Sequence, residues 1–300
     1  MQHSFYKRQQ GFTLLELLVV ITLLAVLAVG ALVAYEGVGD QAGATAAANN
    51  TATVDRSLRN YRAVTKTYPS QWDNIAASDT GAPLTFLDTT TRAAFGSWNV
   101  GGATSAVSAA LFDSLEGVGI DEIQQLTVAN IATGVAPNLQ HNEGSNANST
   151  EDDIDTATRL TIMPSRTAGH VCTAGAQTIG SSFTAVVTAA ANSKLNQIND
   201  SLGTDTCHLV IALGFGHDAA HSTADKSVAI AQAPTHTSKA INPATDYARY
   251  LALFHMGSGA TSAATDITTA DILATPRLVA VVDPEGNPID VNLLAANANQ

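Results

Sequence analysis

Charged residues are scarce in this sequence. Of its 300 residues, 13% are charged and 45% are hydrophobic, which is too apolar for a disordered chain, so we expect one sizeable core or two small ones. Basic residues are scarcest, since 14 lysines and arginines stand against 26 acidic residues, a net charge of −12. A negative surface repels phosphate backbones and anionic lipid, so we do not expect nucleic-acid binding to be the main role.

Recognisable catalytic motifs are also missing. The sequence contains no nucleophile elbow, no P-loop, no protein-kinase motif set and no haem-attachment CxxCH. We therefore expect that the protein is not an enzyme.

What the sequence does have is one long apolar run near its start, over residues 12–34. The run is interrupted by four residues only: Thr13, Glu16, Thr22 and Gly30. Its length of 23 residues is about what a helix needs to span a bilayer core. Lys7 and Arg8 precede it with no acid beside them, and positive flanks stay cytoplasmic. We predict a single-pass membrane anchor with the remaining chain, of net charge −14, outside.

Cysteine occurs only twice, at Cys172 and Cys207, both in the predicted exterior part. In an oxidising compartment an isolated pair usually forms a disulfide, and a loop of this length would contribute about 3 to 4 kcal/mol of stability. Two buried free thiols are the alternative. Neither cysteine has the CxxC or HxxxH neighbours that a metal site needs, so we predict a Cys172–Cys207 disulfide.

The N-terminal segment is not ordered like an ordinary secretory signal, in which the cleavage site follows a shorter apolar core. Here Gly11 precedes the apolar run. The segment KRQQGFTLLELLVVITLL, residues 7–24, closely resembles the prepilin leader and N-terminal helix of type IV pilins and type II secretion pseudopilins. This resemblance implies that a prepilin peptidase removes leader residues 1–11, cutting between Gly11 and Phe12, and that Phe12 becomes the N-methylated first residue.

Glu16 makes the resemblance specific. A carboxylate inside a spanning helix costs about 2.5 to 3.5 kcal/mol on insertion scales, so this residue needs a partner. The resemblance implies that its partner is the Phe12 ammonium of a neighbouring subunit, because docking then neutralises two charges where water is scarce. An ordinary anchor that carries a stray acid is the alternative.

A helical period continues after the apolar run. Five residues recur at steps of four and three: Val54, Leu58, Tyr61, Thr65 and Tyr68. We predict one helix over residues 12–68, with a transmembrane half at 12–34 and an amphipathic half that packs on a head. Such a rod would be about 80 Å long and would stop at Pro69, with loosening expected at the glycines of residues 37–43.

The head, residues 69–300, is expected to be α+β with an antiparallel sheet. Runs rich in β-branched residues predict strands at 208–215 and 277–282, and longer patterns predict helices at 110–126 and 190–202. The polar stretch 138–155 is expected to be an exposed loop or a boundary between two lobes.

Three fragments of the head invite a binding-site interpretation. Gly214, Gly216 and Ala219 have dinucleotide-site spacing, but no acid follows about 20 residues later and no βαβ unit is visible, so turns are the preferred interpretation. His217 and His221 share a helix face, with Asp218 and His208 nearby, but no third zinc ligand is evident, and solvated surface histidines are expected.

The fragment DPEGNPID offers four oxygen donors: Asp283, Glu285, Asn287 and Asp290. Some pseudopilin heads bind calcium, yet the glycine is not at the EF-hand position and a tight turn explains these residue types. A second acidic set is a similar candidate for calcium binding: Glu151, Asp152, Asp153 and Asp155. We expect no cofactor and no metal, with calcium as the alternative.

The resemblance implies a structural subunit of a type IV pilus or pilus-like filament that polymerises through its N-terminal helix. Its partners would be copies of itself, minor pilins or pseudopilins, the prepilin peptidase and the inner-membrane assembly platform. It would be a single-pass inner-membrane protein with a periplasmic head, and then part of an extracellular or periplasmic filament. The alternatives are a type II secretion pseudopilin, a minor pilin, a filament-borne adhesin or binding module, and a membrane-tethered enzyme.

Overall fold

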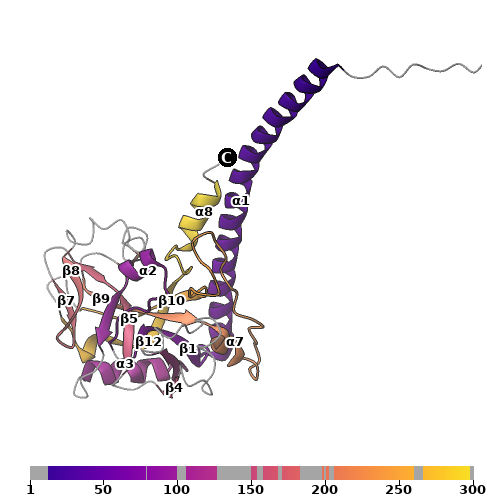
Figure 1. The fold of residues 1–300 in the computed structure, drawn as a ribbon. Coiled ribbons are helices and arrows are strands. Elements are labelled where there is room, and N and C mark those ends of the chain that lie inside the picture. Colours follow the sequence, from indigo (N-terminus) through magenta and orange to yellow (C-terminus); the bar gives the residue numbers. More distant parts are fainter. Residues whose placement is uncertain are drawn as a thin grey trace, which may run out of the picture.

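The structure, a computed structural model, describes residues 13–78, 80–99, 106–126, 150–153, 158–167, 171–182, 198, 201–202, 206–259 and 266–297. Figure 1 shows one long helix, α1 (Leu14–Thr65), whose second half lies on a globular head and whose first half projects away from it. The head combines mixed β-sheet with short helices. The predicted α+β class, with a long N-terminal helix on a globular head, is confirmed.

Helix α1 runs for 52 residues without interruption, which is a length of about 78 Å. It begins after the N-cap Thr13 and ends at Lys66, whose φ of 68° is the left-handed conformation that closes many helices. Pro69 then prevents any continuation. The helix stays continuous through the glycines of residues 37–43, so the loosening expected there is absent; alanines on either side favour the helical state.

The larger sheet is mixed rather than purely antiparallel. Its strands are β1 (Gln71–Ala77), β2 (Gly96–Asn99), β3 (Glu122–Leu126), β4 (Thr150–Asp153), β5 (Arg159–Met163), β9 (His208–Phe215), β10 (Tyr250–Ser258) and β12 (Ile272–Val282). The order is β12-β10-β9-β1-β3-β4, and β5 joins β9 to β2. The β1–β3 pair is parallel, whereas the other pairs are antiparallel. Every residue of β9 is buried, which explains its continuous apolar sequence.

A smaller sheet lies beside the first. Its strands, in the order β11-β7-β8-β6, are β6 (Ser165–Thr167), β7 (Cys172–Ala174), β8 (Gln177–Ser182) and β11 (Asp266–Ile267). The predicted disulfide is present: Cys172 of β7 is bonded to Cys207, the residue before β9, with their Cα atoms 5.5 Å apart. It therefore links the two sheets.

The head also contains the short helices α2 (Thr89–Ala94), α3 (Ala106–Glu116), α7 (His217–His221), the 3-10 helix η2 (Thr269–Asp271) and α8 (Ile289–Asn297). The helix predicted at 110–126 is wrong in its second half, because α3 ends at Glu116 and residues 122–126 form β3. Gly119, with a φ of 83°, turns the chain between them. Strand β3 then pairs with β1, a long-range contact that a local pattern does not reveal.

The other predicted elements have mixed outcomes. The strands at 208–215 and 277–282 are confirmed as β9 and the end of β12. Residues 150–153 of the expected polar loop instead form β4, which pairs with β3. The rest of that loop up to residue 149 and most of the helix predicted at 190–202 lie outside the described residues.

An aromatic cluster anchors the core where α1 ends. The Trp72 ring is fully buried, with its centroid 5.3 Å from that of Phe254 and 5.6 Å from that of Phe215. Tyr68, just after α1, packs edge-on against Phe254 at 5.0 Å. These rings join the end of the helix to the central strands β9 and β10.

Two buried histidines share one serine at the far end of these strands. Ser258 Oγ lies 2.7 Å from His208 Nδ1 and 2.8 Å from His255 Nε2. Burial, together with the neighbouring His208, lowers the pKa of His255 to about 4. The folded protein therefore keeps this ring neutral well below the pH at which a free histidine gains its proton.

The disulfide should stabilise the head measurably. Replacing both cysteines, Cys172→Ala with Cys207→Ala, should lower the free energy of unfolding by about 3 to 4 kcal/mol, because the unfolded chain loses a constraint on 35 residues. Denaturant unfolding of both proteins in the same detergent measures this difference. A loss below about 1 kcal/mol would contradict the assignment of a stabilising cross-link.

The buried His255 should make stability depend on pH. Between pH 6.5 and about 4 the unfolded state binds a proton at this ring that the folded state refuses, so the contribution present above pH 6.5 falls as the pH falls through this window. We expect Tm to decline less between pH 6.5 and 4 in His255→Gln, which keeps a hydrogen-bonding partner for Ser258. Equal declines in the two proteins would show that this ring is not responsible.

Candidate assembly site

The start of α1 is closed by a reciprocal capping box between Thr13 and Glu16. Glu16 Oε2 accepts hydrogen bonds from the Thr13 backbone N–H and from the Thr13 hydroxyl, each at 2.9 Å, and Glu16 N–H donates to Thr13 Oγ1 at 3.2 Å. The carboxylate is therefore folded back toward the N-terminus of its own helix. Gly11 and Phe12, the predicted processing residues, lie outside the described residues.

The first half of α1 has no cover from the rest of the described chain. Leu14–Val33 is 20 residues long with a mean hydropathy of 2.7, and none of it is buried within the chain. By length and composition it can cross a membrane, within the predicted span of 12–34. Its Thr22 hydroxyl donates to the Val19 carbonyl at 2.9 Å, so this polar group is satisfied inside the helix. The segment therefore presents a nearly continuous apolar surface.

The second half of α1 is fixed to the head at two levels. Near its end the Arg62 guanidinium lies over the Tyr68 ring, 4.7 Å from its centroid, donates to the Tyr68 hydroxyl, and donates to the Pro276 carbonyl of β12 at 3.2 Å. Farther up, Gln41 Nε2 donates to the Ala296 carbonyl at 3.0 Å and so caps the last turn of α8. The buried Leu58 packs into the core between these two levels. The helix and head therefore form one connected body.

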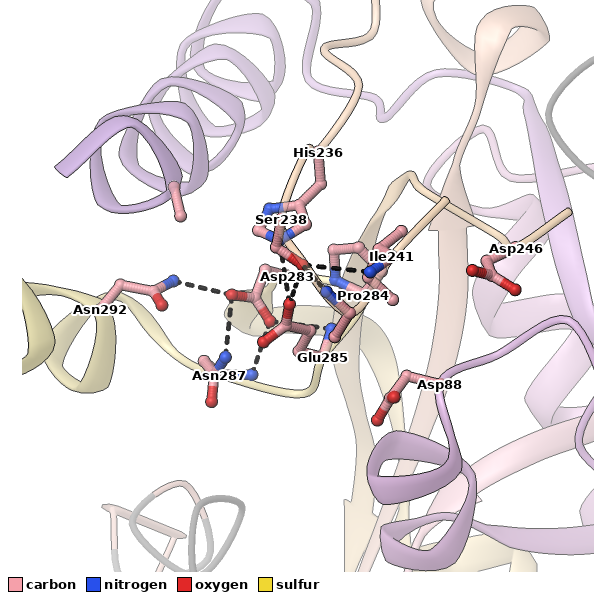
Figure 2. A network of polar contacts seen from close by, with 12 residues as sticks. Asp88, His236, Ser238, Ile241, Asp246, Asp283, Pro284, Glu285, Asn287 and Asn292 are labelled. Carbon is pink, nitrogen blue, oxygen red and sulfur yellow. Dashed lines mark hydrogen bonds and ion pairs between the residues drawn. The ribbon is translucent and has the colours of Figure 1, made fainter. Parts of the chain in front are cut away.

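The turn that leads into α8 is organised by the buried Asp283 (Figure 2). Its Oδ1 accepts from the backbone N–H groups of Glu285 and Asn287 at 3.0 and 2.8 Å. Its Oδ2 accepts from the amide groups of Asn287 and Asn292 at 3.1 and 2.9 Å. Burial raises the pKa of Asp283, and these N–H donors partly offset that effect. The carboxylate thus holds the β12–α8 turn together, in agreement with the tight-turn interpretation of DPEGNPID.

The other residues of that fragment face different partners. Glu285 accepts from the Ser238 hydroxyl and lies 3.5 Å from His236 Nε2, and Asp290 lies in the first turn of α8. Residues 151–153 of the second acidic set belong to β4, and Asp155 lies outside the described residues. Within the described ranges, no three His, Cys, Asp or Glu side chains are grouped so as to hold a metal ion.

The glycines with dinucleotide-site spacing serve close packing. A Cβ at Gly214 would lie 1.9 Å from the Tyr247 hydroxyl, and one at Gly216 would lie 2.2 Å from Asp73 Oδ2. Tyr247 donates to Asp73 at 2.5 Å in the interior, so the glycines leave room for this pair. The flanking strand β9 pairs antiparallel with each of its neighbours, unlike a strand of a βαβ unit.

The histidines do not converge. His217 and His221 stack on α7 with ring centroids 5.8 Å apart, and His217 Nδ1 lies 3.2 Å from Asp218 Oδ1. His208 instead lies at the opposite end of β9, beside His255. The structure thus keeps His217, Asp218 and His221 together on α7 and separates His208 from them.

Sequence reasoning missed α8 and its contact with α1. The available signals were Pro288, which suits the first turn of a helix, and the apolar residues that follow it in IDVNLLAAN. The glutamine of α1 that caps α8 gives no local signal, because 255 residues separate Gln41 from Ala296.

Comparison with known proteins bears on the N-terminal segment alone. No curated protein and no solved structure matches the chain. Residues 6–32 match the family described as the prokaryotic N-terminal methylation motif. This match spans the Gly11–Phe12 junction, the capping box and most of the apolar half of α1, so the chain carries the prepilin-type signal of type IV pilin and pseudopilin precursors.

Proposed function

We propose that this chain is a structural subunit of a type IV pilus or pilus-like filament and not an enzyme. A prepilin peptidase cuts it after Gly11, and the mature chain polymerises through α1. The observation that carries the proposal is the apolar half of α1, which bears the methylation motif and which the described head leaves uncovered. Such an apolar surface can be covered by the lipid of a bilayer or by similar helices packed around it.

In this proposal, Glu16 determines which helix replaces lipid around the apolar half of α1. Before assembly, the Thr13 capping box supplies the carboxylate with two hydrogen bonds but no opposite charge. Processing creates an ammonium at Phe12, and a neighbouring copy brings that ammonium to Glu16. The pairing of Glu16 with the Phe12 ammonium neutralises one positive and one negative charge in a medium of low dielectric, where unpaired charges are costly.

The proposal also assigns a location and partners. The subunit waits in the inner membrane with its acidic head on the periplasmic side, because Lys7 and Arg8 stay cytoplasmic. The assembly platform then adds it to copies of itself and to related minor subunits.

A type II secretion pseudopilin or a minor pilin is the second candidate. The disulfide favours this second candidate. Major pilins commonly have a disulfide that closes a short loop near the C-terminus, whereas Cys172–Cys207 joins two sheets inside the head. A filament-borne adhesin or binding module would share the same N-terminal half.

Processing and location are tested together by intact mass. We expect filaments sheared from the cell surface to contain a species that starts at Phe12 and carries one added methyl group, while uncut precursor stays in the membrane. A processed form that remains in the envelope would instead indicate the pseudopilin or minor-pilin role. A chain that still starts at Met1 in every fraction would refute the proposal.

Charge pairing is tested by substitutions at Glu16. Glu16→Ala should leave cleavage and membrane insertion intact and reduce assembled protein at least roughly tenfold, because each subunit contact then leaves one ammonium unpaired at low dielectric. Thr13→Val is the matched control, because it removes the hydroxyl of the capping box while keeping the carboxylate, and its defect should be smaller. Sheared-filament yield measures both. Normal filaments from Glu16→Ala would exclude the charge-pairing step.

A further inference from the structure

The outer face of helix α7 carries two histidines whose rings lie together. His217 and His221 are four residues apart, and their rings stack with centroids 5.8 Å apart and planes 12° from parallel. Both residues are exposed, and the His217 side chain is 58% exposed. Residues at this spacing occupy one face of a helix, so both rings meet solvent on the same side of α7. We call these two residues the α7 histidine pair.

A buried carboxylate orients the first ring of the pair. Asp218 is 8% exposed, and its Oδ1 lies 3.2 Å from His217 Nδ1. An ionised carboxylate only accepts hydrogen bonds, so Nδ1 carries the proton and Nε2 keeps its lone pair. Histidines that bind metal ions commonly have such a partner, which fixes both the orientation of the ring and its tautomer. The Nε2 atom of His217 is therefore prepared to bind a metal ion.

The backbone beneath the pair is well anchored. Ala219 and Ala220 of α7 belong to the main hydrophobic core. The Ser222 N–H donates to the Asp218 carbonyl at 2.7 Å, and Ser222 Oγ accepts from the Ser70 N–H at 3.3 Å, directly before β1. Figure 1 shows α7 at the periphery of the head, on the side away from β7 and β8. One face of the helix is thus held by the head, while the face with the two rings is open to solvent.

We propose that the α7 histidine pair binds one divalent transition-metal ion, with water in the remaining coordination positions. Imidazole nitrogens suit copper, nickel and zinc, whereas calcium and magnesium prefer oxygen ligands. A metal ion about 2.1 Å from each ring nitrogen would set the two centroids about 5 Å apart. Starting from the observed 5.8 Å, a small rotation of two exposed side chains supplies this approach.

The rest of the described chain is compatible with a site of two protein ligands. No three His, Cys, Asp or Glu side chains are grouped around an ion in the described ranges, so the pair would act without a third such ligand. The chain after its basic leader carries a net charge of −14, which attracts cations. The other histidines of the described ranges are buried and compete poorly for an ion from solvent: His208, His236 and His255.

Zinc binding by the full chain in detergent tests the pair. Titration calorimetry with ZnCl2 compares the wild type with His217→Gln, His221→Gln and the double variant. Each single substitution should weaken the tightest site about tenfold or more, since loss of a ligand costs at least as much as loss of the group that orients it. The double substitution should weaken it little further, because one remaining imidazole no longer chelates.

Two controls accompany this titration. His141→Gln makes the same exchange at a histidine outside the pair and should leave the zinc affinity unchanged. Excess calcium should not displace zinc from nitrogen ligands. Equal affinities in the wild type and the two single variants, an equal loss in His141→Gln, or displacement by calcium would each place the ion elsewhere and overturn the inference.

A second measurement locates the ion without any substitution. Diethyl pyrocarbonate modifies accessible imidazole nitrogens, and mass spectrometry of peptides identifies the modified residues. Saturating zinc should protect His217 and His221 together, because a nitrogen bound to the ion no longer reacts. Unchanged modification of both residues in zinc would contradict the site. Neither measurement depends on filament assembly, so the inference and the proposed filament function fail separately.

Discussion

The constraint on which this molecule depends is an uncovered apolar helix half. Leu14–Val33 is apolar enough to cross a membrane, and the described head buries none of it. In water such a surface would drive aggregation. The chain must therefore keep it either in lipid or against other helices. Under the proposed function, these two environments are the membrane of the precursor and the assembled filament. The acidic head at the other end keeps the remainder soluble in both states.

Helix α1 and the head are joined by contacts at several points along the second half of the helix. Arg62 ties the end of the helix to β12, and Gln41 ties its middle to α8. Trp72, immediately after the helix, is buried among aromatic rings of the central strands. A force along α1 therefore reaches the sheet through packed side chains and does not act on a loose linker. Under the proposed function, this connection lets the head move with α1 when the subunit leaves the membrane.

The sequence predicts what local patterns encode and misses what distant pairing decides. The order Gly11, Phe12 and Glu16 suffices for the N-terminal signal, which the comparison confirms, and the continuous apolar run of 208–215 suffices for β9. In contrast, residues 122–126 continue a helical pattern but form β3, because β1 offers them hydrogen bonds across the fold. The capping of α8 by Gln41 is hidden for the same reason. The role of Phe12 stays a prediction, since it lies outside the described residues.

The division between motif and head bears on how a filament chooses its subunits. A pairing of one carboxylate with one ammonium is available to every chain that carries the same N-terminal motif, so it promotes assembly without distinguishing partners. Specificity requires contacts that differ between competitors. Under the proposed function, the head can supply such contacts, because it lies outside the matched residues 6–32.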